Sequence, residues 1–81
     1  MQEVIYTAKR DFGIIDFMGN EHPVKMFDKL DGSYVGKRID DVNIYSVRLS
    51  DGTAPLYTEG WIRQFFDIKK KEVDDEIRRM D

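Results

Sequence analysis

The stretch that decides the fold is 43–66, NIYSVRLSDGTAPLYTEGWIRQFF. Apolar and polar residues alternate over 45–50, which predicts a strand with one buried face. Asp51-Gly52 follows, and this pair suits the positive φ angles of a tight hairpin turn. The stretch therefore predicts a hairpin followed by the apolar start of a helix.

A two-residue turn at this pair would fix the register of the hairpin. Val47 and Leu56 then lie on the buried side, with Tyr57 on the exposed side. Pro55 falls opposite Arg48 at a hydrogen-bonded position, where a proline has no N–H to donate. We therefore expect the second strand to be short, and either at a sheet edge or bulged.

The residues before this stretch contain two apolar runs of strand length, Glu3–Lys9 and Phe12–Met18, which could pair as a first hairpin. In Pro23–Leu30, apolar residues fall at i, i+3, i+4 and i+7, which favours a short helix, with a strand as the alternative. The segment Ser33–Val42 lacks a clean period. We expect a connection there, with a short strand near Tyr34.

The end of the chain carries a long helical stripe, whose residues are Ile62, Phe65, Phe66, Val73, Ile77 and Met80. A separate helix beginning near Ile68 would place three lysines in its first turn, at the positive end of the helix dipole. One helix capped by Thr58 places the charges better. We therefore expect a helix over Glu59–Met80, about 22 residues and roughly 33 Å long.

The predicted fold is α+β, with a small antiparallel sheet from two hairpins, a short central helix and a long C-terminal helix across one face. The alternative is an SH3-like β-barrel with a C-terminal helix, because a YSVRLSDGT turn followed by a short strand and an apolar helical turn also occurs in such barrels. Residues 1–81 form a single small domain.

Composition limits the function classes. The chain has 16 acidic and 13 basic residues, a net charge of −3, and no cysteine. This balance gives no general attraction to nucleic acid or anionic membranes, and no disulfide or thiolate zinc site can form. No signal peptide or membrane-spanning stretch is visible, so the expected compartment is the cytoplasm.

No catalytic constellation stands out. His22 has no second histidine or cysteine to join it in a metal site, which favours a surface or capping role. Four acids, Asp16, Glu21, Asp40 and Asp41, could gather around a divalent ion, but no spacing connects them. We therefore expect no enzyme, no cofactor and no metal.

The outward face of the hairpin suggests binding instead. Arg48, Pro55 and Tyr57 share that face, with Trp61 one helical turn further on. Tyrosine, arginine and tryptophan often dominate binding energy at interfaces. We predict a non-catalytic protein–protein interaction module, a small regulator or inhibitor of a larger protein, with these four residues as its patch. The opposing interpretation is that Tyr57 covers a bulge and Arg48 pairs with Glu59.

The sequence also allows other functions and a second binding surface. A nucleic-acid-binding accessory protein is the alternative function, and its basic and aromatic candidates are Lys9, Arg10, Lys37, Arg38, Arg48, Lys69, Lys70, Lys71, Tyr6, Tyr34 and Tyr45. The helix face of Val73, Ile77 and Met80 could bind a partner or a second copy, or pack on the protein's own sheet, giving a monomer or a homodimer. A third hypothesis, a regulator encoded by a phage or mobile element, follows from the compact, cysteine-free, acidic chain.

Overall fold

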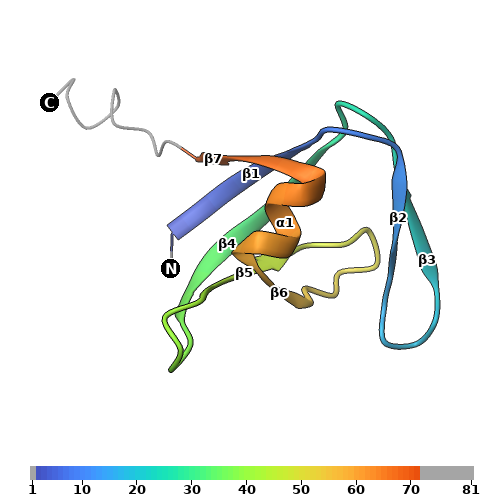
Figure 1. The fold of residues 1–81 in the computed structure, drawn as a ribbon. Helices are drawn as coiled ribbons and strands as arrows, with labels where there is room; N and C mark the ends of the chain where they lie inside the picture. Colours follow the sequence, from blue (N-terminus) through green and yellow to red (C-terminus); the bar gives the residue numbers. More distant parts are fainter. Residues whose placement is uncertain (1, 72–81) are drawn as a thin grey trace, which may run out of the picture.

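A computed structural model describes residues 2–71. Its elements in chain order are β1 (Gln2–Ala8), β2 (Phe12–Ile15), β3 (Glu21–Val24), β4 (Lys29–Lys37), β5 (Asn43–Val47), β6 (Leu56–Thr58), α1 (Glu59–Phe65) and β7 (Phe66–Lys70). Five strands form one antiparallel sheet in the order β6-β5-β4-β1-β7, and β2 and β3 pair as a separate hairpin (Figure 1).

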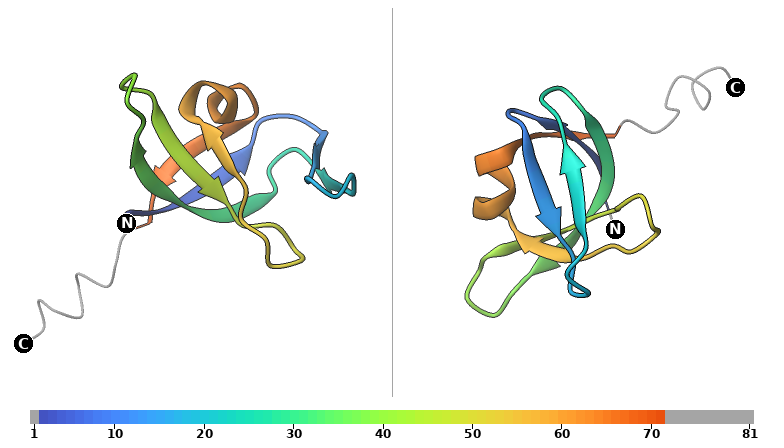
Figure 2. Two further views of the ribbon diagram at one scale, coloured as in Figure 1. Left: turned by 90° about the horizontal axis from the view of Figure 1, so that it is seen from below. Right: turned by 90° about the vertical axis from the view of Figure 1, so that its right-hand side faces the viewer.

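The sheet is strongly bent, with α1 across one side and the β2–β3 hairpin projecting beside it (Figure 2). Its inner face holds the core, whose buried apolar residues are Val4, Tyr6, Ala8, Ile14, Val24, Val47, Leu49, Ile62 and Phe66. The strand predicted over Glu3–Lys9 is confirmed, because β1 buries alternate residues there. Tyr6 is fully buried, and its hydroxyl donates to the Ser46 carbonyl at 2.7 Å.

The predicted α+β fold with a long C-terminal helix is wrong. The helix begins where expected, since the Thr58 hydroxyl accepts from the Trp61 N–H, but it ends at Phe65. Phe66 takes an extended conformation (φ −135°, ψ 152°), and the Phe65 carbonyl accepts from Lys9 N–H instead of continuing the helix. The second half of that prediction, including Val73, Ile77 and Met80, lies outside the described residues.

Pairing with β1 explains this correction. Phe66 and Ile68 alternate with Asp67 and Lys69, a period that suits a strand as well as the preceding spacing suits a helix. As a strand, β7 lies antiparallel to β1, and Phe66 becomes fully buried. The alternative prediction, an SH3-like barrel, is nearer to the structure in being a small β-rich domain.

The predicted helix over Pro23–Leu30 is also wrong. Pro23 lies in β3, and a turn follows in which Phe27 adopts a positive φ of 74°. Two carboxylates stabilise this turn by accepting hydrogen bonds from its backbone N–H groups. Asp28 accepts from Lys25 N–H, and Asp11 accepts from Met26 N–H.

The remaining differences concern pairing. The two N-terminal runs do not form a hairpin, because β1 pairs with β4 and β7 while β2 pairs with β3. Where a connection was expected after Ser33, the nine-residue strand β4 continues to Lys37, with a bulge between Tyr34 and Gly36. The predicted position of the second hairpin arm at a sheet edge is confirmed, since the three-residue β6 is one of the two edge strands of the five-stranded sheet.

The hairpin register differs from the prediction by one residue. Tyr45 faces Tyr57 and Ser46 faces Leu56, because residues 48–55 form a longer loop closed by a Leu49 N–H to Thr53 carbonyl bond. A one-residue shift moves every side chain of a strand to the other face. Leu56 is therefore 59% exposed, while Tyr57 packs against the core.

Candidate functional site

Four aromatic side chains form a continuous row along one side of α1. They are Phe12, Tyr57, Trp61 and Phe65, and we call them the aromatic row. Tyr57 stacks on Trp61 with centroids 4.1 Å apart and rings 13° from parallel. Trp61 then contacts Phe65 at 4.9 Å, and Phe65 contacts Phe12 at 4.6 Å. All four side chains are partly exposed, so the row is a surface of the molecule.

Local structure explains how the row is assembled. Trp61 and Phe65 are four residues apart, which places them on one side of a helix. The observed hairpin register turns Tyr57 toward them, and β2 begins with Phe12 beside Phe65. Ile62 and Phe66, next to Trp61 and Phe65 in the sequence, are fully buried, and the rings of the row pack against this core.

The two ends of the row carry opposite charge. At one end the Arg10 guanidinium lies over the Phe65 ring, 5.6 Å from its centroid. At the other end the Asp16 carboxylate lies close enough to Tyr57 to help raise the pKa of its hydroxyl, after burial, which is the larger cause.

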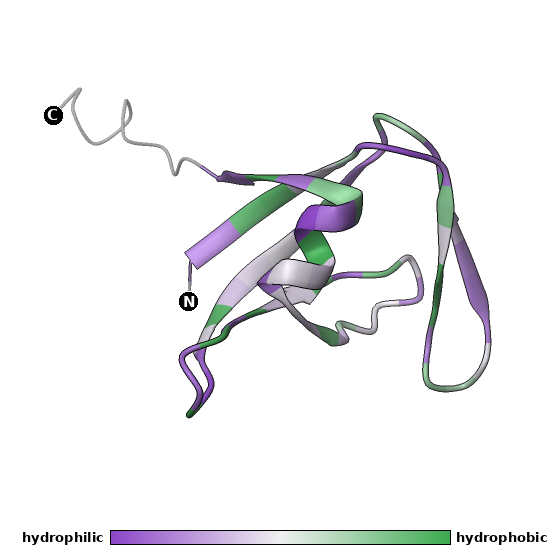
Figure 3. Ribbon diagram, in the orientation of Figure 1, coloured by the Kyte–Doolittle hydropathy of each residue, from purple (hydrophilic) through white to green (hydrophobic). Residues whose placement is uncertain are grey.

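The β2–β3 hairpin beside the row exposes unusually large apolar side chains. Phe17 is 84% and Met18 74% exposed at its tip, and Phe27 is 75% exposed in the turn after β3. Figure 3 shows hydrophobic residues at both ends of this hairpin. Exposed apolar groups gathered on one projecting element are typical of contact surfaces.

The structure brings together two of the four predicted patch residues. Tyr57 and Trp61 stack within the aromatic row. Pro55 lies in the loop before β6, where its carbonyl accepts from Val47 N–H. No hydrogen bond, ion pair or cation–π contact joins Arg48 to the row anywhere in 2–71, and Arg48 N–H donates to the Asp31 carbonyl.

The expected pairing of Arg48 with Glu59 is replaced by a different network. Glu59 accepts from Arg63 Nε at 2.6 Å and from Asn43 Nδ2 at 2.7 Å. Sequence reasoning missed Phe12, Phe65 and Arg10 as members of the site. For Phe65, its four-residue spacing from Trp61 was a signal available in the sequence.

A polar cluster stabilises the hairpin tip near the Tyr57 end of the row. His22 Nε2 lies 2.8 Å from Asp16 Oδ2 and 3.7 Å from Asp51 Oδ2. Asp16 Oδ1 accepts from Met18 and Asn20 N–H, and these bonds, with His22 as the largest cause, lower the pKa of the Asp16 carboxyl. Sequence reasoning gave His22 no partner.

The ligand atoms of Asp16, His22 and Asp51 lie within 4.8 Å of one another, a chemically suitable set for a divalent ion. Both Asp16 oxygens are already hydrogen-bonded, however, and its side chain is 3% exposed. In this arrangement the cluster joins the hairpin tip to the loop between β5 and β6. It does not include Glu21, Asp40 or Asp41, and Asp40 pairs instead with Arg38 at 2.8 Å.

The nucleic-acid candidates do not form a single stripe. Tyr6 is buried, so its ring cannot stack on a base. Arg10 lies over the Phe65 ring of the aromatic row, and Arg38 pairs with Asp40. A hollow of about 490 Å³ is lined by Lys29, by Lys69 and Lys70 of β7, and by Lys71 just after that strand.

Within 2–71, no helix has both the length and the apolar character needed to cross a membrane. Comparison with known protein families, curated proteins and solved structures finds no match to this chain.

Proposed function

We propose that this protein is a non-catalytic protein-binding module, a small regulator or inhibitor of a larger protein, whose partner docks along the aromatic row. The observation that carries the proposal is the row itself, in which a tyrosine, a tryptophan and two phenylalanines contact one another ring to ring yet stay partly exposed. Tryptophan and tyrosine are the residue types most enriched among interface hot spots.

Rigidity of the row supports this proposal. Each ring is held by a neighbouring ring, and the row packs against the buried core. A partner that covers rings already fixed in place loses little side-chain entropy on binding. The row therefore offers a large apolar contact area at low entropic cost.

The surroundings of the row indicate what the partner offers. The exposed apolar tip at Phe17 and Met18 follows Asp16, which lies beside the Tyr57 end. At the same end the Asp51 side chain is 42% exposed, whereas Asp16 is buried. We expect a partner segment that places apolar side chains on the row and a basic side chain near Asp51.

Affinity capture from a cytoplasmic extract tests the proposal. The bait is the wild-type chain, and the test variant is Trp61→Leu/Phe65→Leu, which keeps apolar bulk under the surface while removing the rings. The control is Leu56→Ser, because Leu56 is an exposed apolar residue that lies on the opposite face of β6 from Tyr57. We expect the test variant to lose its partner by about tenfold or more, as for a hot-spot loss.

Thermal unfolding of each bait shows that it is folded before capture. A partner retained undiminished by the folded double variant would contradict the proposal. So would an equal loss with Leu56→Ser, because the contact would then not depend on the row.

A nucleic-acid-binding accessory protein is the second candidate. The hollow lined by Lys29, Lys69 and Lys71 favours it, since clustered ammonium groups attract phosphates. Against it, Lys71 lies 3.8 Å from Glu3, and lysines on an edge strand such as β7 commonly prevent sheet-to-sheet pairing. If the affinity for an oligonucleotide does not change between about 50 and 200 mM salt, this candidate is excluded.

A further inference from the structure

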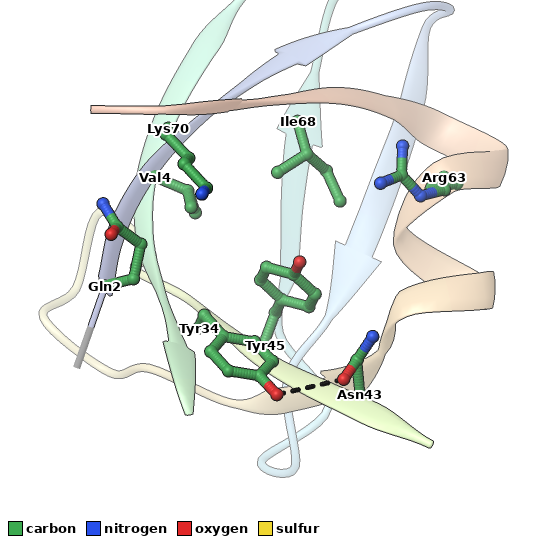
Figure 4. Close-up of a pocket in the computed structure, with 8 residues that line it drawn as sticks. All are labelled: Gln2, Val4, Tyr34, Asn43, Tyr45, Arg63, Ile68 and Lys70. Carbon is green, nitrogen blue, oxygen red and sulfur yellow. Dashed lines mark hydrogen bonds between the residues drawn. The ribbon is translucent and has the colours of Figure 1, made fainter. Parts of the chain in front are cut away.

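A second hollow opens on the other side of α1 from the aromatic row. It has a volume of about 410 Å³ and is lined by residues of β1, β4, β5, α1 and β7, including Asn43 at the start of β5 (Figure 4). This volume lies within the range of small-molecule sites. Val4 and Ile68 give the hollow an apolar wall, and the Tyr34 ring forms another side.

Arg63 enters this hollow in a fixed orientation. Its Nε donates to Glu59 Oε2 at 2.6 Å, and the other Glu59 oxygen accepts from Asn43. Both Glu59 oxygens are thus occupied, and the structure shows no partner for the two terminal nitrogens of Arg63 among residues 2–71. A guanidinium held through Nε presents these terminal nitrogens as a fork that suits an oxyanion.

Two more donors face the same space from other strands. The Tyr45 hydroxyl, on β5, points between Arg63 and Lys70, and Lys70, on β7, extends toward it from the opposite side (Figure 4). Neither group has a hydrogen-bond or ion-pair partner in the described part of the chain. Burial raises the pKa of Tyr45, so its hydroxyl keeps its proton and can donate.

β7 contains two lysines, and its register places only Lys70 on the inner face of the sheet. Lys70 pairs with Val4, whose side chain points to the inner face of the sheet. Lys69 pairs with Ile5, and side chains alternate along a strand, so Lys69 points to the opposite face. Lys69 is therefore a natural control for Lys70, with the same charge on the same strand.

We propose that this hollow binds the phosphate group of a small phosphorylated ligand. Arg63 and Lys70 lie on opposite sides of the hollow, and the neutral Tyr45 hydroxyl points into the space between them. These donors match a group with three terminal oxygens and a charge near −2. A carboxylate has two oxygens and one charge, so it would leave one donor unmatched. The hollow is larger than a phosphate, which leaves room against Tyr34 for the group that carries it.

Titration of the ¹⁵N-labelled chain with inorganic phosphate tests this proposal, at constant ionic strength set by chloride. We expect saturable amide shifts around positions 45, 63 and 70, with a Kd on the order of 1–10 mM for so small a ligand. Tyr45→Phe, Arg63→Gln and Lys70→Gln should each weaken binding about fivefold or more. Arg63→Lys should also weaken it, because the charge stays but the fork is lost.

Lys69→Gln should leave the affinity within about twofold of wild type, as expected for a charge on the far face. Shifts that stay linear, or equal weakening by Lys69→Gln and Lys70→Gln, would overturn the proposal, because general charge screening would explain both. Acetate that binds as tightly as phosphate would overturn the choice of phosphate. Trp61 is the single tryptophan, and its emission should not change, since it lies on the other side of α1.

Discussion

The two sides of α1 differ in what holds their side chains in place. On one side, the aromatic row is fixed by ring contacts above a buried floor. On the other, Arg63 and Glu59 are fixed by hydrogen bonds and remain partly in solvent, with side chains 57% and 26% exposed. Burial contributes far more to stability than exposed ion pairs do. The row should therefore matter for folding as well as for binding, and the charged side chiefly for binding.

The largest loss of stability should come from truncating the buried core residue Phe66, which lies beneath both sides of α1. Phe66 is fully buried and contacts Tyr6 and Phe12 at centroid distances of 5.4 and 5.3 Å. Phe66→Ala should cost about 3–5 kcal/mol, which is comparable to the total stability expected of so small a domain. Circular dichroism and urea unfolding should show a largely unfolded chain. A cooperative transition near the wild-type midpoint would contradict the place of Phe66 in the core.

The next effect tests the hairpin register that turns Tyr57 toward the row. Tyr57→Lys should destabilise the domain by about 2–3 kcal/mol, because a half-buried stacked ring is lost. Leu56→Lys should change the stability by about 0.5 kcal/mol or less, since Leu56 is exposed. Chemical denaturation of both variants decides between the registers. The opposite order of effects would indicate the register of a two-residue turn.

A smaller effect separates the two sides within α1 itself. Trp61→Ala should cost about 1–2 kcal/mol through the lost contacts with Tyr57 and Phe65. Arg63→Ala is the matched change on the other side, and should cost about 0.5 kcal/mol or less because the pair with Glu59 is exposed. Equal losses of unfolding free energy would mean that the charged side also supports the fold.

The smallest effect concerns acid. Hydrogen bonds from Asn43 and then Arg63 lower the pKa of Glu59 below its ordinary 4.5. A lowered folded-state pKa stabilises the fold above pH 4.5, and this contribution is lost as the pH falls through the folded value. Glu59→Gln should therefore reduce the loss of stability between about pH 5 and 3 by roughly 0.5 kcal/mol. Unfolding curves that keep the wild-type acid dependence would show that Glu59 contributes nothing to it.

Much of the local structure could be predicted from the sequence because it depends on near neighbours. Alternation identified β1, and the cap at Thr58 set the start of α1. The proline at position 55 correctly indicated a short edge strand. These features follow from rules that act over a few residues.

The errors arose where distant residues decide the outcome. Phe66 fits a helical stripe, and its extended conformation depends on pairing with Ala8 far away in sequence. Phe27 at positive φ gives no sequence signal, because glycine or asparagine is the usual choice there. The hairpin register shifted because a loop of eight residues, closed at Leu49 and Thr53, replaced the two-residue turn.

The candidate site was only half visible for the same reason. Tyr57 and Trp61 were chosen for their residue types and lie together, although the predicted register pointed Tyr57 the other way. Phe12 joins the row from β2, and Asp51 meets His22 across 29 positions of sequence. No local pattern predicts either contact.

The central claim is that partners bind on the row side of α1, and site-specific photocrosslinking tests it most directly. A benzoyl-phenylalanine at position 61 should crosslink to one protein in a cytoplasmic extract. Excess wild-type chain should compete for that product, whereas excess Trp61→Leu/Phe65→Leu should not. The same probe at position 56, on the opposite face of β6, should give no such product. Equal crosslinking from both positions, or competition by the double variant, would contradict the claim.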